Sequence, residues 1–276
     1  MQALKHIAAS LLLLFVVGAV SAQPLGDPPR DRAFDEISYG EAMSIPYDHI
    51  READVFWEKR MWRVIDFREK MNLPFAYPKL PLAQVLVDLV KSGEASAYHP
   101  LDDDFSNELT PEAIENKLYR VDTITTYDLD TYEEITQVIE SDFDPIWVTK
   151  LWVKEDWIFD EETSSMVCRI IGIAPVRELI DENSGLVIGD ELMFWLYYPE
   201  LRETLATKAV FNQFNDAVRM SWEDVFEMRM FSSYIIKESN VYDRTIENYA
   251  TGIDAVLESE RLKDKIFMFE HELWEF

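Results

Sequence analysis

Between Asp54 and Pro78 the apolar residues recur with a spacing that predicts a helix. At about 100° per residue, the apolar positions share one broad arc: Val55, Trp57, Met61, Trp62, Val64, Ile65, Phe67 and Met71. Polar side chains take the opposite side: Lys59, Arg63, Asp66 and Lys70. An apolar arc of this width is typical of a helix that the rest of its domain covers. Pro74 and Pro78 are expected to end this helix.

Three further helices carry local signals at their ends. Gly93 is placed to stop a helix over residues 81–90, because glycine adopts the left-handed conformation that often follows a helix. Thr110 is the expected N-cap of a second helix, with Pro111 at its first position. Ser221 can cap a third. These signals predict where each helix begins or ends.

The last third of the chain predicts two more helices. One is short and covers residues 199–206, and the other is long, amphipathic and covers residues 254–274. We expect the long helix to offer its apolar side chains to the core: Leu257, Ile266, Phe267, Leu273 and Trp274.

In the middle third the apolar period changes to two, which is typical of strands. One face of the segment over residues 147–159 carries Trp147, Thr149, Leu151, Val153, Trp157 and Phe159, interrupted only by Glu155. The other face of this segment carries polar side chains: Lys150, Lys154 and Asp156. This alternation predicts a half-exposed antiparallel strand. Residues 167–176 are apolar on both faces, which places them in the middle of the sheet, and residues 192–198 predict a third strand.

The remaining segments are shorter. Residues 123–126 and 233–237 favour strands, whereas residues 132–139 fit a strand or a helix. A polar turn is expected at residues 160–165 and a loop at residues 183–185.

Together these elements predict an α+β fold, with an antiparallel sheet in the middle of the chain and helices packed around it. No linker or internal repeat divides residues 47–276, so we expect one domain there, although the length alone permits two. The structural core is expected to contain large apolar side chains from four segments: Trp57, Trp62, Ile65, Trp152, Trp195 and Trp274.

The N-terminus has the three parts of a secretory signal peptide. Basic residues precede an apolar run over residues 7–20, and small residues follow up to Ala22. The run is shorter than the ~20 residues of a membrane span, so we expect cleavage rather than insertion. Residues 1–22 are therefore the predicted signal peptide, and the proline-containing residues 23–46 the predicted flexible arm.

The chain is strongly acidic, with 26 Lys and Arg residues against 53 Asp and Glu residues. Loss of residues 1–22 removes one base and no acid, which changes the formal charge from −27 to −28. Nucleic acids and anionic lipid surfaces are poor partners for such a chain, because binding them relies on Lys and Arg. Cys168 is the only cysteine, in a strand-like run, and is predicted to be an inert buried thiol.

The sequence contains no recognisable catalytic, metal or cofactor motif. His49, His99 and His271 lie far apart, and His271-Glu272 lacks the second histidine of a zinc-protease motif. The Asp-rich segments lack the pattern of a calcium loop, and there is no glycine-rich phosphate loop. We therefore assign no catalytic residue, no metal ligand and no cofactor.

The amino-acid composition does not exclude one class of enzyme, the glycoside hydrolases. A glycoside hydrolase needs two carboxylates and often uses aromatic sugar platforms, and this chain has many of both. With 53 acidic residues, carboxylate pairs arise by chance. A secreted glycan-binding protein or glycoside hydrolase with paired carboxylates is therefore the alternative to a non-catalytic interaction protein.

An ordered set of segments resembles the GldN family of gliding-motility proteins, called PorN in non-gliding relatives, of the Bacteroidota type IX secretion system. The resemblance covers about residues 47–276, and these segments carry it: READVFWEKRMWRVID (51–66), NLPFAYP (72–78), LWVKEDWIFD (151–160), RIIGIAP (169–175), FWLYYPELR (194–202), YIIKESNVYDR (234–244) and FEHELWEF (269–276).

The resemblance implies a periplasmic structural subunit without catalytic residues. Such proteins associate with an outer-membrane lipoprotein, GldK or PorK, in a ring beneath the outer membrane, and contact the periplasmic part of the motor protein GldM or PorM. The chain itself would not enter the membrane. From its charge we further expect a partner with a basic face, and acidic neighbours for the cations Lys59, Arg63 and Lys70.

Overall fold

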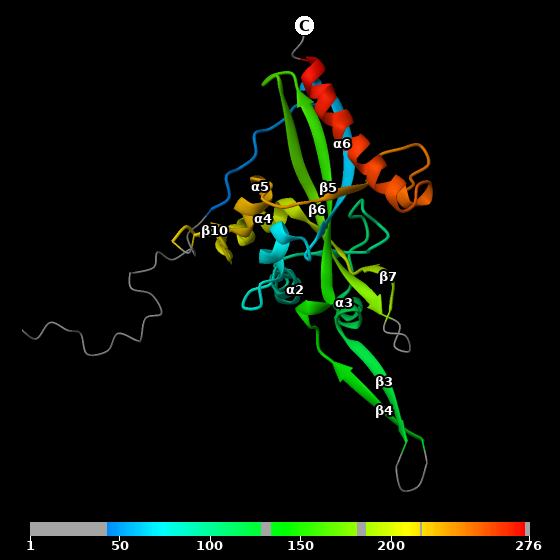
Figure 1. The fold of residues 1–276 in the computed structure, drawn as a ribbon. Coiled ribbons are helices and arrows are strands. Elements are labelled where there is room, and N and C mark those ends of the chain that lie inside the picture. The colour runs from blue at the N-terminus through cyan, green and yellow to red at the C-terminus, as the bar shows by residue number, and fades with distance from the viewer. Residues whose placement is uncertain (1–42, 128–133, 181–185, 216, 274–276) are drawn as a thin grey trace, which may run out of the picture. The chain divides into compact units, whose positions relative to one another are not determined.

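The computed structural model describes residues 43–127, 134–180, 186–215 and 217–273, all within one compact unit, Tyr39–Phe276. The fold is α+β, as predicted, and its main feature is an antiparallel sheet of seven strands (Figure 1). Six strands follow the order β11-β1-β5-β6-β8-β2, and β7 pairs with β6. Their bounds are β1 Val55–Asp66, β2 Ala97–Tyr98, β5 Val148–Asp160, β6 Ser165–Ile180, β7 Val187–Leu192, β8 Trp195–Tyr197 and β11 Tyr234–Glu238.

Two small hairpins complete the strands. One joins β3 (Arg120–Tyr127) to β4 (Glu134–Ser141), so the segment that fitted either a strand or a helix is a strand. The other joins β9 (Ala209–Val210) to β10 (Met220–Ser221). The predicted loop at 183–185 lies outside the described residues.

The helices predicted from local signals are present where expected. They are α2 (Leu82–Ser92), α3 (Pro111–Leu118), α4 (Tyr198–Thr207), α5 (Trp222–Glu227) and α6 (Ile253–Leu273), with short 3-10 helices η2 (Glu52–Asp54), η3 (Lys70–Ala76), η4 (Pro145–Trp147) and η5 (Ile246–Asn248). Gly93 follows α2 in the left-handed conformation with φ 75°. Thr110 accepts a hydrogen bond from the backbone N–H of Ala113, and Ser221 forms a capping box with Asp224.

The predicted helix at the start of the domain is wrong, because Val55–Asp66 is the twelve-residue strand β1. It lies between β11 and β5, and residues 61–65 are all buried because both faces of the strand are covered. Ile65 packs with the cluster around α2, α4 and α5, whereas Trp62 and Val64 pack with Trp195 in a different cluster. A segment that is apolar on every side fits both the helical period of about 3.6 residues and the strand period of two. The pairing with β5 and β11 decides that this segment is a strand.

The face of β5 that was expected to be half-exposed is covered. Lys154 is 2% exposed and Asp156 is 7% exposed. The loop that contains Asp103 and Phe105 lies over this face: Lys154 donates a hydrogen bond to the Asp103 carbonyl, and its Nζ is 5.3 Å from the Phe105 ring centroid. Asp156 pairs with Arg60 at 2.7 Å. A long-range loop therefore covers polar positions that alternation alone assigns to solvent.

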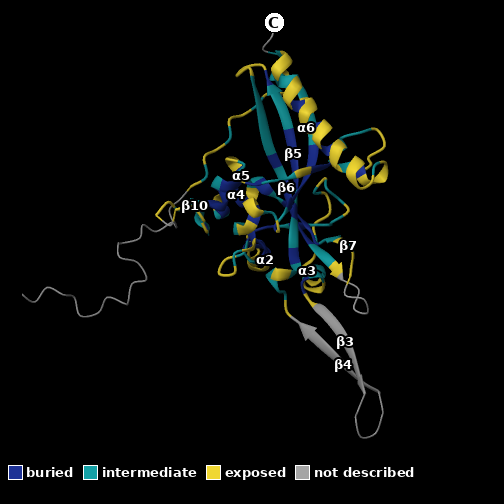
Figure 2. Ribbon diagram, in the orientation of Figure 1, coloured by how far each residue is buried: buried dark blue, intermediate teal, exposed yellow. Residues whose placement is uncertain are grey.

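Helix α6 turns a different face to the sheet than predicted. Leu257 and Phe267 are 62% and 64% exposed, whereas Ile266 is buried as predicted, together with Ser259 and Leu262. Exposed and buried stretches alternate along α6 in Figure 2. Leu273 is half-buried, and Trp274 lies outside the described residues.

The expected core residues differ in burial. Trp62, Ile65 and Trp195 are buried, and Trp57 and Trp152 are half-buried. Trp57 stacks on Phe269 of α6 with 4.6 Å between ring centroids, which ties the start of β1 to the end of this helix.

Candidate functional site

The edge strand β11 and the helix α6 build a cavity at one side of the sheet. Strand β11 pairs with β1, and no other strand in the described part of the chain pairs with its second edge. Helix α6 packs along β11, and the Ser259 hydroxyl accepts a hydrogen bond of 2.9 Å from the backbone N–H of Ile235. A helix that covers a sheet edge prevents unwanted pairing with another strand. It also leaves room for a cavity between its N-terminal half and β11.

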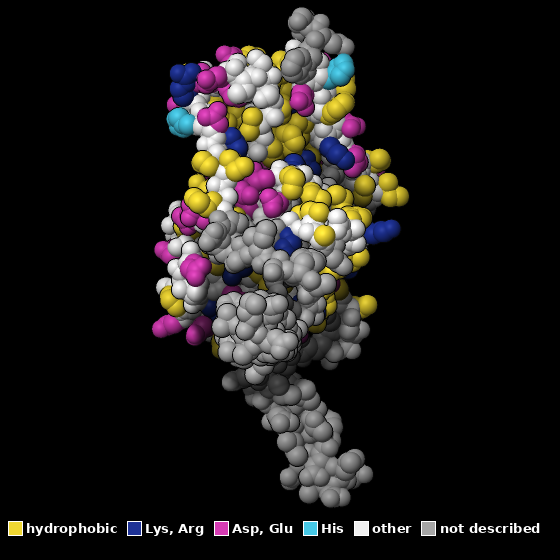
Figure 3. Space-filling view, turned by 90° about the vertical axis from the view of Figure 1, so that its left-hand side faces the viewer, with side chains coloured by type: hydrophobic (Ala, Val, Ile, Leu, Met, Phe, Trp, Pro, Cys, Tyr) yellow, Lys and Arg dark blue, Asp and Glu magenta, His cyan; other side chains and the backbone are white. Residues whose placement is uncertain are grey.

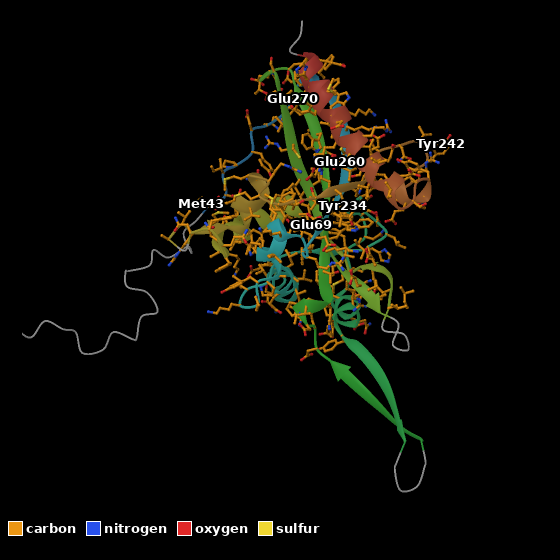
Figure 4. All side chains as sticks on the ribbon, viewed as in Figure 1. Met43, Glu69, Tyr234, Tyr242, Glu260 and Glu270 are labelled. Atoms are coloured by element: carbon orange, nitrogen blue, oxygen red, sulfur yellow. The ribbon has the colours of Figure 1, made fainter. Side chains whose placement is uncertain are left out.

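This β11–α6 cavity has a volume of 690 Å³ and an apolar floor. The floor consists mainly of aliphatic side chains: Ile235, Ile236, Ile246, Ala250 and Ala255. Its rim carries Glu69, Glu260 and Tyr234, which are labelled in Figure 4. Glu247 also lines the cavity, so the three carboxylates come from separate segments of the chain. The site therefore combines a hydrophobic interior with an acidic border.

The titration of Tyr234 reflects this acidic surrounding. Burial, together with the charges of Asp66, Asp190, Glu247 and Glu69, raises the pKa of Tyr234 to about 12. At the rim, Glu260 lies 3.6 Å from Lys263. Among the described residues, no ion pair involves Glu69 or Glu247, so two of the three rim carboxylates are available to a cation from outside.

Exposed apolar side chains lie next to the cavity on α6. Ile253, Val256 and Leu257 are 78%, 63% and 62% exposed, one or two turns from Glu260. The face seen in Figure 3 likewise has hydrophobic side chains in patches between charged ones. Apolar residues gathered beside a polar rim are typical of a protein-binding surface.

A further apolar groove lies between η3 and the β9–β10 hairpin. It has a volume of 510 Å³, and its lining includes the exposed side chains Met71, Phe211, Phe214 and Met230. Phe211 stacks on Tyr77 with 4.4 Å between centroids, which holds one wall. The surface thus offers more than one apolar recess to a partner.

Residues 50–275 match the family described as "Gliding motility associated protein GldN". The chain belongs to the GldN family. A search of curated proteins finds no match. The resemblance noted in the sequence is therefore confirmed, and the chain is a gliding motility-associated protein.

The buried carboxylates of this GldN-family chain are engaged by partners. Glu155 contacts Arg63 and Arg229, Asp156 contacts Arg60, and Glu223 contacts Arg202 at 2.7 Å. Asp160 accepts hydrogen bonds from the Glu162 backbone N–H and the Thr163 hydroxyl. Burial raises the pKa of Glu223, and its partner Arg202 acts in the opposite direction.

Other expectations about chemistry can be compared with the described residues. Cys168, predicted to be a buried thiol, is half-buried, and desolvation raises the pKa of its thiol. No group of three or more His, Cys, Asp or Glu side chains there has the arrangement of a metal site. No helix within the described ranges is long and apolar enough to cross a membrane.

The predicted cationic surface requires correction. Arg63 is 6% exposed and pairs with Glu155 inside the domain, because β1 is a strand that turns this side chain toward the covered face. Lys59 is half-buried and donates a 2.8 Å hydrogen bond to the Ser239 carbonyl. Of the three cations, Lys70 alone is exposed.

Sequence reasoning did not single out the four residues at the rim of the β11–α6 cavity. Glu69, Glu247 and Glu260 are three among 53 acidic residues, and nothing in their spacing distinguishes them. The apolar residues at the start of α6 were the one available signal, since they exceed what a single buried face needs.

Proposed function

We propose that this chain is a non-enzymatic, periplasmic structural subunit of the type IX secretion and gliding motility machinery. It associates peripherally with the outer membrane through a GldK- or PorK-like lipoprotein, takes part in a ring, and contacts the periplasmic part of a GldM- or PorM-like motor protein. Membership of the GldN family is the observation that carries this proposal. The signal-like residues 1–22 and the arm 23–46 support export of the domain over residues 47–276.

The β11–α6 cavity is the surface that we propose for a partner. Its aliphatic floor suits an apolar side chain, and the carboxylates Glu69, Glu247 and Glu260 suit Lys or Arg beside that side chain. A basic partner surface also lowers the repulsion between copies whose formal charge is −27 each before cleavage.

Binding of the lipoprotein tests this assignment. We expect the mature chain and the soluble part of the lipoprotein to form a complex whose affinity falls between low and physiological salt, since exposed ion pairs are screened. We expect a triple variant to bind about tenfold more weakly at low salt, because each exposed ion pair contributes roughly 0.5 kcal/mol. This variant combines Glu69→Gln, Glu247→Gln and Glu260→Gln. Isothermal titration calorimetry measures both effects.

The matched control changes the same charge elsewhere. Glu94, Glu115 and Glu203 are exposed and do not line the cavity, so Gln at all three positions is expected to leave the affinity unchanged. Equal weakening in both triple variants, or a complex indifferent to ionic strength, contradicts the assigned surface. A persistent monomer that ignores the lipoprotein and binds oligosaccharide favours the glycan-active alternative.

A further inference from the structure

A second cavity lies on the other side of α6, against the central strands of the sheet. It has a volume of 500 Å³ and is lined by side chains from β1, β5, the segment after α5, and the C-terminal half of α6. The residues that matter are Arg63, Arg229, Lys263, Trp157, Phe231 and Phe267. In contrast to the β11–α6 cavity, three of these six side chains are cationic.

One buried carboxylate lies between the two arginines of this cavity. Glu155 is 0% exposed, and its Oε1 lies 2.9 Å from Nη1 of Arg229. The Glu155 Oε2 lies 3.1 Å from Nε of Arg63 and accepts a 3.0 Å hydrogen bond from the Trp157 indole. Two guanidinium groups therefore share a single buried anion.

Among the described residues, Glu155 is the one carboxylate in ion-pair contact with either arginine, and the charge of Glu227 acts on Arg229 from farther away. Arg229 donates to the Cys168 sulfur at 3.1 Å, but burial raises the pKa of that thiol, so the thiol stays protonated and neutral. Burial also lowers the pKa of Arg63, and the charge of Arg229 acts in the same direction. Because arginine nevertheless keeps its proton in proteins, the cluster carries one excess positive charge next to the cavity.

Arg63 retains donors that can serve a ligand. A guanidinium has five N–H groups, and the side chain of Arg63 is 7% exposed. Its Nε is close to Glu155 but not aligned for a hydrogen bond, and its Nη1 makes one long contact of 3.4 Å with the Ser233 hydroxyl. Buried donors without good partners favour an acceptor that enters the cavity.

We propose that this arginine cavity binds a carboxylate group attached to an apolar or aromatic moiety. Arginine forks match carboxylates with two parallel hydrogen bonds. The rings of Trp157, Phe231 and Phe267 form the apolar wall for the rest of the ligand. Arg63 and Arg229 lie over the Trp157 ring at 5.7 and 5.4 Å, which holds both cations in place.

A singly charged carboxylate fits better than a phosphate. Glu155 contacts both arginines, and Glu270 is one of the residues that line the cavity. These two carboxylates repel a dianion more than a monoanion. The source of the group is a protein, as an acidic side chain beside an aromatic one, or a small aromatic acid.

Calorimetric titration of the mature, full-length chain with 3-phenylpropanoate tests the site without any partner protein. We expect binding, and at least tenfold weaker binding of the neutral 3-phenylpropanamide, because hydrogen bonds to a charged group are worth about 1.5–3 kcal/mol. Equal binding of acid and amide, or no binding of the acid, overturns the proposal. This titration contains no lipoprotein, so its result tests the cavity separately from the proposed function.

Two variants and one control locate the binding. Lys263 is 59% exposed on α6, so Lys263→Gln is expected to fold normally and weaken binding severalfold, whereas Arg63→Gln should abolish it if folded. Lys265→Gln removes an equally exposed cation from the same helix that does not line the cavity, and should leave binding unchanged. Equal weakening by Lys263→Gln and Lys265→Gln contradicts the site.

A second experiment, with peptides, distinguishes a protein segment from a small aromatic acid as the source of the carboxylate. Peptide amides that contain adjacent Glu and Phe are compared with the same peptides carrying Gln in place of Glu. Binding of the Glu peptide that competes with 3-phenylpropanoate assigns the site to a protein segment. Binding of the small acid alone assigns it to a free aromatic acid, and both results support a carboxylate site.

Discussion

The two cavities beside α6 both have apolar lining residues, aliphatic in one and aromatic in the other, and they carry opposite charges. The β11–α6 cavity carries its charge on the rim, on Glu69, Glu247 and Glu260, whereas the arginine cavity carries it at the base, on Arg63 and Arg229. Glu260 and Lys263, one on each cavity, lie 3.6 Å apart on the surface of the helix that separates them.

The position of the charge decides what each cavity can discriminate. Rim carboxylates stay hydrated, so they attract cations over a long range, weakly, and in a salt-dependent way. Arg63 is buried, Arg229 is half-buried, and both contact Glu155, so a ligand must present an acceptor in the correct geometry. The first arrangement suits a broad protein surface, and the second a defined chemical group.

Removal of the shared anion is expected to give the largest effect. Glu155→Gln leaves the buried guanidinium of Arg63 and the half-buried guanidinium of Arg229 without this carboxylate, and breaking a buried ion pair costs about 3–5 kcal/mol. Denaturant unfolding of the full-length chain measures the loss. Glu260→Gln, at the exposed rim, is the control and should change the free energy of unfolding by less than about 0.5 kcal/mol.

An apolar reference shows whether the loss in Glu155→Gln is electrostatic. Trp62 is 6% exposed on the opposite face of the sheet, and Trp62→Ala is expected to cost about 3–5 kcal/mol with little dependence on salt. If Trp62→Ala lowers the free energy of unfolding and Glu155→Gln leaves it unchanged, the arginines do not depend on Glu155.

A smaller loss is expected at the wall of the β11–α6 cavity. Ser259→Ala removes the acceptor of the Ile235 N–H, a buried donor at the edge of β11. An unsatisfied buried donor costs about 1–3 kcal/mol. Hydrogen exchange should show faster exchange at Ile235 than in the parent chain, and Ser259→Thr, which keeps a hydroxyl, should restore protection. Equal exchange in Ser259→Ala and the parent excludes this role for Ser259.

The smallest effect concerns the titration of Tyr234. Its pKa is raised from 10.0 to about 12, first by burial and then by carboxylates. The neutral phenol is favoured in the folded chain, so this contribution to stability is complete below pH 10 and is lost as the pH rises through about 12. Glu69→Gln with Glu247→Gln should lower this pKa in part, because burial remains. Ultraviolet difference titration against Tyr234→Phe isolates this group, and an unchanged midpoint contradicts the acidic rim.

The errors of sequence interpretation lie where distant segments meet. Arg63 was assigned to a polar helix face, yet β1 pairs with β5 and brings Arg63 to Glu155. Lys154 was assigned to solvent, yet a loop some fifty positions earlier covers it. For α6 the expected apolar face included Leu257 and Phe267, which are exposed, because the helix is apolar on two sides. Neither periodicity nor charge pattern contains these long-range contacts.

The sequence by itself determined the α+β class, the caps at Gly93, Thr110 and Ser221, and the GldN family, because these depend on local backbone preferences and on ordered motifs. The tertiary structure alone decided that residues 55–66 form a strand and that α6 separates an acidic from a cationic cavity. The physical reason is that each cavity draws its walls from segments far apart in the chain. The charges on these segments interact strongly only when folding brings the segments within a few ångströms of one another and removes water between them.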